Sequence, residues 1–144
     1  MRLSAKAQYA CVAMVDLACS HGSPNPMHLK HIADKHGISQ RFLVQILLQL
    51  KTAGLVASVR GAAGGYQLAK PPDGISLAAI INAIDDRALT PRSALGEAYR
   101  SGVVETLLSV WREIQFAQQT MLEKLTLAEL MRRTQQANGL SYQI

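Results

Sequence analysis

Residues 29–46, LKHIADKHGISQRFLVQI, contain the pattern that decides the fold. Gly37 lies between two short helical repeats and can adopt the positive φ that reverses the chain. Ala33 is small where the two helices must cross closely, while Leu43 and Ile46 face back and fix the crossing angle. This spacing is typical of a helix-turn-helix. Two unrelated helices joined by a glycine turn would account for Gly37 alone and would place the other three residues by chance.

Helix and strand signals continue on both sides of this motif. Before it, apolar residues at three-and-four spacing follow the N-cap Ser4, and after it two strand-like runs flank the glycine-rich residues 61–65. Further along, Ser76 caps another helix, and Thr126 with Glu129 forms a capping box. The predicted elements are helices over residues 4–20, 27–36 and 40 to the stop at Gly54, strands over 55–60 and 66–69, and helices over 76–84, 103–125 and 126–131.

Composition and charge are those of a globular protein with one basic half. Its 144 residues are 49% hydrophobic and 17% charged, and no stretch approaches the roughly 20 uncharged apolar residues of a membrane helix. Residues 1–70 hold eight basic and two acidic side chains, a net charge of +6, whereas residues 71–144 hold seven and eight, a net charge of −1. A basic first half fits nucleic acid or an anionic membrane surface. We therefore expect binding and scaffold roles in separate halves.

The predicted hairpin favours nucleic acid, because a two-stranded wing after a helix-turn-helix can reach a second groove. Arg60 stands at its base, from where a guanidinium can enter the narrow, electronegative minor groove. The glycines of the tip let the backbone approach the phosphates. The alternative is a surface hairpin with a charged edge. A nucleotide loop is excluded, since the segment lacks the Gly-Lys-Ser/Thr ending and does not open a helix.

Several motifs together resemble one known family. They are MRLS at residues 1–4 with Lys6 and Tyr9, GIS at 37–39 with Leu43, GLV at 54–56, SVRG at 58–61, GGY at 64–66, residues 80–86, Val110-Trp111 and residues 127–130. The chain resembles the Rrf-type family of bacterial winged helix-turn-helix regulators, which includes IscR-, NsrR- and CymR-like proteins. The resemblance implies a mainly α fold, with a winged helix-turn-helix DNA-binding domain over residues 1–86, a linker or sensor region over 87–101, and a dimerisation helix and C-terminal helix over 102–144.

The same resemblance implies a site and its partners. It implies a homodimer whose long helix crosses its partner and sets two recognition helices on successive major grooves of a palindromic operator in double-stranded DNA. The residues expected at the DNA are Arg2, Ser4, Lys6, Tyr9, Ser39, Arg41, Phe42, Gln45, Arg60, Gly61, Gly64, Gly65 and Tyr66. The residues expected at the dimer interface form the apolar stripe Val104, Leu107, Leu108, Trp111, Ile114, Met121, Leu122 and Leu125. A long helix folded onto its own domain is the alternative for that stripe. IscR-like members have a carboxylate where this chain has Val44, so we expect a different operator.

No cofactor is expected, although some members of this family hold an iron–sulfur cluster. Those members use three closely spaced cysteines before the long helix, whereas residues 87–110 contain neither Cys nor His. Cys11 and Cys19 lie eight residues apart in one predicted helix, about 12 Å along its axis, so they can neither pair nor share one metal. We interpret both as small buried core residues. The helix angles of the histidines at 28, 31 and 36 do not converge, so all are expected to be solvated rather than to bind zinc.

The sequence therefore predicts a dimeric, sequence-specific transcriptional regulator, expected to be a repressor, without a cluster. It leaves open whether a small molecule, a protein or no effector controls it. The alternative is a metal- or cluster-dependent redox or iron sensor of the same family with other ligands. An enzyme is not expected, because no Ser-His-Asp set, P-loop or pocket carboxylate pair emerges, and Asp85-Asp86 is interpreted as a helix end. Gln8 and Asp16 interrupt the apolar stretch that a secretion signal would need, so we expect a cytoplasmic protein without a membrane partner.

Overall fold

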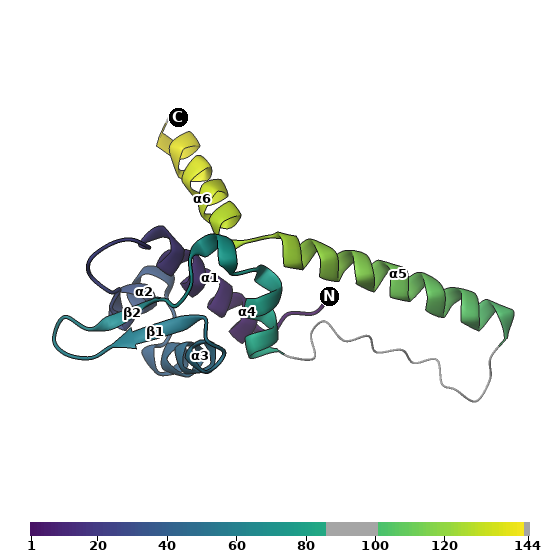
Figure 1. Cartoon of the computed structure of the whole chain (residues 1–144), viewed down its shortest axis with the longest axis horizontal. Helices are drawn as coiled ribbons and strands as arrows, with labels where there is room; N and C mark the ends of the chain where they lie inside the picture. Colours follow the sequence, from purple (N-terminus) through teal and green to yellow (C-terminus); the bar gives the residue numbers. More distant parts are fainter. Residues whose placement is uncertain (86–100, 143–144) are drawn as a thin grey trace.

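The chain forms helices over most of its length and one short hairpin (Figure 1). The structure is a computed structural model that describes residues 1–85 and 101–142. In chain order its elements are α1 (Ala5–Cys19), α2 (Leu29–His36), α3 (Gln40–Thr52), β1 (Val56–Val59), β2 (Gly65–Leu68), the 3-10 helix η1 (Pro72–Gly74), α4 (Leu77–Ile84), α5 (Gly102–Lys124) and α6 (Leu127–Tyr142). The predicted mainly α fold with a two-stranded wing is confirmed. The proposed linker or sensor region over 87–101 lies outside the described residues, except for Ser101.

The N-terminal helices begin and pack as their sequences dictate. Ser4, Ser39 and Ser76 cap α1, α3 and α4, because each hydroxyl accepts a hydrogen bond from the backbone N–H three residues on, at 3.0, 3.3 and 3.1 Å. The apolar faces of these helices then meet in one core. Its largest fully buried side chains are Met14, Leu17, Ile32, Leu43, Ile46, Leu47, Leu50, Ile75, Ile80, Ile81 and Leu127.

The wing includes a one-residue third strand that periodicity did not predict. β1 and β2 pair antiparallel, and Met27 adds to the other edge of β2. The Met27 N–H donates to the Tyr66 carbonyl at 2.9 Å, and the Tyr66 N–H donates to the Met27 carbonyl at 2.8 Å. The predicted helix start at residue 27 is therefore wrong. α2 begins at Leu29, because the backbone of Met27 is committed to the sheet.

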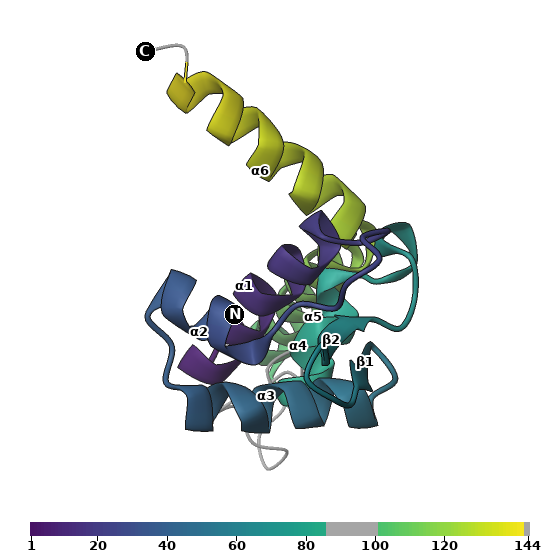
Figure 2. The same cartoon turned by 90° about the vertical axis from the view of Figure 1, so that its left-hand side faces the viewer.

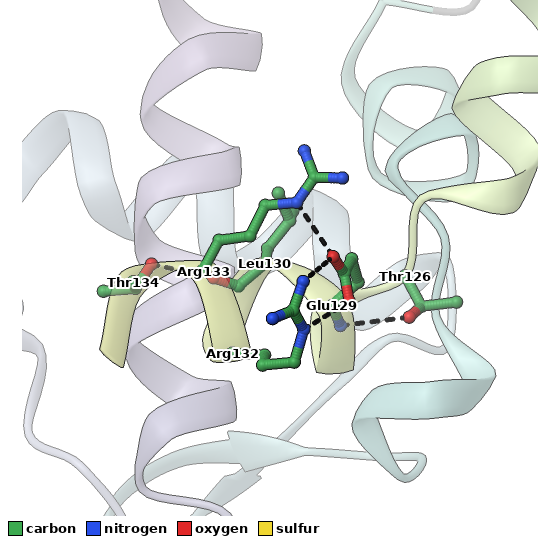
Figure 3. Close-up of polar contacts among 6 residues, drawn as sticks. All are labelled: Thr126, Glu129, Leu130, Arg132, Arg133 and Thr134. Carbon is green, nitrogen blue, oxygen red and sulfur yellow. Dashed lines mark hydrogen bonds and ion pairs between the residues drawn. The ribbon is translucent and has the colours of Figure 1, made fainter. Parts of the chain in front are cut away.

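The start of α6 realises one half of the predicted capping box (Figure 3). Thr126 accepts a hydrogen bond from the Glu129 N–H at 3.2 Å. The Glu129 carboxylate, however, bonds Arg132 at 2.6 and 2.9 Å and Arg133 at 2.9 Å. These contacts at helical spacing support a helix that runs to Tyr142, well past the predicted end at residue 131.

Two backbone hydrogen bonds join the segment between α5 and α6 to the N-terminal domain. The Leu77 N–H donates to the Leu125 carbonyl at 2.8 Å, and the Leu127 N–H donates to the Ile75 carbonyl at 2.9 Å. α5 then extends away from the rest of the chain (Figure 1), and Leu122 is its one buried residue. Among the helices of residues 1–85 and 101–142, none has both the length and the apolar character that crossing a membrane requires.

Candidate nucleic-acid interface

The turn between α2 and α3 has the predicted helix-turn-helix geometry. Gly37 adopts the left-handed conformation with φ 64°, where a side chain would be strained. The Ile38 N–H donates to the Ala33 carbonyl at 2.9 Å and closes the end of α2. Ala33, Leu43 and Ile46 are all buried where the two helices meet. The four residues that predicted the motif therefore occupy the positions assigned to them.

The outer face of α3 carries basic, polar and two apolar side chains and no acidic one. Arg41 and Gln45 are exposed on it, as predicted. Residues 35–72 contain five Lys or Arg residues and no Asp or Glu. Among the labelled elements α3 lies on the lower side in both views, and α6 projects from the upper side (Figure 1 and Figure 2). A duplex can therefore approach α3 without meeting α6.

Two aromatic rings connect α3 to α1. Phe42 and Tyr9 meet edge to face, with ring centroids 5.9 Å apart and planes at 89°. Phe42 is half-buried, and its ring packs between the two helices while part of its surface stays accessible. Tyr9 is more exposed, and its ring lies beside α3.

Two hydrogen bonds of Ser4 hold the N-terminal arm, residues 1–6, in place. Besides capping α1, Ser4 donates its backbone N–H to Asp85 Oδ2 at 3.0 Å. Asp85 also caps the end of α4 through its own N–H, which agrees with the helix-end interpretation. Arg2 is exposed and Lys6 half-buried, so this arm places two cations at the start of α1.

Arg60 and Gly61 lie at the outer end of the wing. β1 ends at Val59, and the exposed Arg60 follows it, so the predicted position at the base of the hairpin is wrong. Gly61 has φ 108°, a conformation that favours glycine and lets the chain turn there. The arginine thus lies where β1 ends and the connecting loop of the wing begins.

Gly64, Gly65 and Tyr66 allow the backbone segments of the wing to pack closely. A side chain on Gly64 would collide with the backbone of Val59, and one on Gly65 would collide with the backbone of Met27. These close approaches explain both glycines without reference to phosphates. Tyr66 is half-buried and holds Met27 through the two backbone hydrogen bonds described above.

Sequence reasoning missed Lys51, which connects the recognition helix to the wing. Its Nζ donates to Ser58 Oγ at 2.8 Å, from the last turn of α3 to β1. The two residues are seven apart and belong to different predicted elements, so no periodic pattern could have paired them.

Sequence reasoning also missed an ionic contact between α1 and α2. Asp16 is 7% exposed, and its carboxylate lies 3.0 Å from Lys35 Nζ and 2.5 Å from His36 Nε2. His36 is exposed, as are His28 and His31, but its Nε2 contacts a carboxylate of the same chain, which the expectation of a purely solvated histidine did not include. An acidic residue on the buried face of an otherwise apolar helix was the available signal.

The predicted dimer stripe is divided by the structure. Leu122 packs against Ala78 and Ile81 of α4, so for this residue the alternative of folding onto the same chain applies. Leu107, Trp111, Ile114 and Met121 are exposed, whereas Val104, Leu108 and Leu125 are half-buried. Three further exposed apolar residues of α5 lie outside the predicted stripe, namely Val103, Val110 and Phe116. A groove of about 810 Å³ between α5 and α6 is lined by Phe116, Ala117, Thr120, Met121, Lys124, Leu125, Glu129 and Arg133.

Comparison with known proteins now decides the family. Residues 3–133 match the family described as Rrf2, iron-dependent transcriptional regulator. The chain belongs to the Rrf2 family. The regulator IscR of Aliivibrio salmonicida is 36% identical over 91% of the chain and 77% of its own length. The IscR of Yersinia pestis is 37% identical over 91% and 79%.

Solved Rrf2-like structures agree with the fold. CymR, the global cysteine regulator of B. subtilis, matches with a TM-score of 0.83 and 33% identity, over 92% of this chain and 98% of that one. T. potens IscR matches with a TM-score of 0.75 and 34% identity, over 95% and 90%. This Rrf2-family chain is thus a DNA-binding transcriptional regulator of the winged helix type, and not an enzyme.

Among the residues that the structure describes, the donor atoms of this Rrf2 chain do not fit the iron dependence in the family description. Its two cysteines both lie on α1, one half-buried and one exposed, which corrects the prediction that Cys19 is buried. Burial raises the pKa of the Cys11 thiol to about 11, and burial together with Asp16 raises the pKa of Cys19, so the thiolate forms that ligate iron are disfavoured. Within residues 1–85 and 101–142, no three His, Cys, Asp or Glu side chains are grouped to hold a metal.

Proposed function

We propose that this regulator binds a palindromic operator as a homodimer, with α3 in the major groove and Arg60 in the minor groove, and represses transcription. The observation that supports this best is the placement of α3 and the wing. Both belong to the acid-free segment 35–72, and Lys51 connects them directly. A basic surface of this kind attracts the phosphate backbone, and the exposed helix face reads the base edges.

Each proposed DNA contact has a chemical role. Arg41 can donate two hydrogen bonds to guanine, at O6 and N7. Gln45 can accept one hydrogen bond from adenine N6 and donate one to adenine N7. Arg60 supplies a cation to the electronegative minor groove. Arg2 and Lys6, at the start of α1, would neutralise phosphates. Ser4 and Ser39 use their hydroxyls as helix caps, so we assign them to orienting the backbone near the phosphates.

The homodimer is supported by the exposed apolar side chains of α5. Its 23 residues extend over roughly 35 Å, and Leu107, Val110, Trp111 and Ile114 are exposed along it. An apolar stripe of this length facing water is typical of an interaction surface, and we assign it to a second copy of α5. The domain division at residues 1–86, 87–101 and 102–144 follows from this assignment.

The proposed regulator works without an iron–sulfur cluster, and in the cytoplasm, where bacterial chromosomal DNA lies. A cluster-dependent sensor with other ligands is the competing function, and the family description is the observation that favours it. Absorbance of anaerobically purified protein between about 320 and 420 nm separates the two, because a ligated cluster is coloured. A band there that disappears with loss of DNA binding would establish the competing function.

Operator selection from random duplexes, followed by affinity measurements, tests the DNA-binding assignment. We expect Arg41→Ala, Gln45→Ala and Arg60→Ala each to weaken operator binding by about 1 to 3 kcal/mol while the dimer persists. The matched controls are Gln136→Ala on α6 and Arg112→Ala on α5, both exposed and far from α3 in sequence. Unchanged affinity in all three interface variants would refute the assignment. Repression is tested by transcription in vitro from a promoter that contains the selected operator.

A further inference from the structure

Two apolar side chains stand on the exposed face of the recognition helix. Val44 is 45% exposed and Leu48 is 60% exposed. They are four residues apart, so they lie one above the other on the same side of α3. The other aliphatic residues of this helix, Leu43, Ile46, Leu47 and Leu50, are all buried in the core. Among residues 1–85 and 101–142, nothing covers Val44 and Leu48.

The surroundings of this pair favour a polyanion over an apolar protein groove. Arg41 lies one turn before Val44, Gln45 is adjacent to it, and Lys51 lies three residues after Leu48. No acidic side chain occurs anywhere in residues 35–72. A partner that covers the pair must therefore bring negative charge around a small apolar target.

The major groove contains such a target. The C5 methyl of thymine is the apolar group that base pairs present there, and aliphatic side chains contact it. Neither Val44 nor Leu48 can accept a hydrogen bond, so a cytosine amine beneath them would lose water without gaining a partner. A carboxylate at position 44 would have the opposite preference.

We propose that Val44 and Leu48 read thymine methyl groups, so that the operator carries thymines beneath both side chains. This inference rests on the proposed placement of α3 in the major groove. Burying one methyl group against an aliphatic side chain strengthens binding by about fourfold. Arg41 and Gln45 then select the neighbouring bases, and Val44 and Leu48 determine at which positions beside those bases the thymines lie.

Replacing thymine by deoxyuracil tests this reading, because the change removes the methyl and keeps the base pair. Each thymine of the selected operator is replaced in turn, and affinity is measured for the full-length protein and for Val44→Ala and Leu48→Ala. We expect one or two positions per half-site to lose about fourfold with the unaltered protein. In one of the two alanine variants the loss at a given position should disappear. Both side chains are exposed, so both variants should fold, which circular dichroism checks.

Gln136→Ala is the control, since it shortens an exposed side chain of α6, apart from α3 and from the proposed dimer surface of α5. It should keep every uracil effect. Placing 5-methylcytosine at a position mutated to cytosine should restore part of the affinity. The inference is overturned if uracil has no effect at any thymine, or if its effects persist unchanged in both alanine variants. These results leave operator binding intact, whereas failure to bind any duplex would overturn the proposed function as well.

Discussion

Gly65→Ala should loosen the wing from the body of the protein. The new methyl group would collide with the backbone carbonyl of Met27, which pairs with Tyr66 through hydrogen bonds of 2.9 and 2.8 Å. A backbone atom cannot rotate away as a side chain can, so Met27 must move and both hydrogen bonds lengthen. Each backbone bond contributes about 0.5 to 1.5 kcal/mol net. We therefore expect unfolding free energy to fall by about 1 to 3 kcal/mol.

Urea unfolding at fixed protein concentration measures this loss, and hydrogen exchange localises it. The amides of Met27 and Tyr66 should exchange about tenfold to hundredfold faster than in the unaltered protein. Operator affinity should fall too, because the wing carries Arg60. Gly74→Ala is the matched control, since nothing lies within 4 Å of its added methyl. Equal stability of the two variants, or unchanged exchange at Met27, would refute the account of the third strand.

Three other perturbations test separate features. Asp16→Asn removes a carboxylate that Lys35 Nζ and His36 Nε2 both contact, so unfolding free energy in urea should fall by about 1 to 3 kcal/mol, against at most about 0.5 for the exposed Asp34→Asn. Trp111→Ala should raise the dimer dissociation constant about 30-fold or more in sedimentation, and an unchanged constant would remove α5 from the interface. The arginines beside Glu129 lower its pKa from 4.5 to about 2, so its stabilisation is present above pH 4.5 and lost as pH falls toward 2. The difference in thermal stability between the unaltered protein and Glu129→Gln should therefore shrink as the pH falls through that window. A difference that stays constant with pH would contradict this role of Glu129.

The predictions that succeeded rest on local chemistry. Gly37, Ser39 and Ser76 mark helix ends because a positive φ or a capping hydroxyl acts within three residues of chain. Periodicity likewise placed Leu43 and Ile46 in the core, since a helix fixes which residues share a face.

The predictions that failed depend on contacts between distant residues. Met27 forms a strand of one residue, which has no period to detect, and Asp16 meets His36 across 20 positions. Leu122 continues the apolar stripe of α5 but packs on α4, because a stripe shows that a face is buried and not by which neighbour. At the site, residue types predicted which residues contact DNA, but only the fold showed that the Phe42 ring packs edge to face against the Tyr9 ring.

The junction that holds α5 and α6 to α4 limits which substitutions disturb the arrangement of such a regulator. Its two crossing hydrogen bonds involve only main-chain atoms of Ile75, Leu77, Leu125 and Leu127. Main-chain groups are common to nearly every residue type, so exposed positions of α5 can be exchanged without loosening the joint. In a dimer built on α5, these main-chain contacts then fix the distance between the two α3 helices. Substitutions can change partner choice and base preference separately, while the spacing between the operator half-sites stays constant.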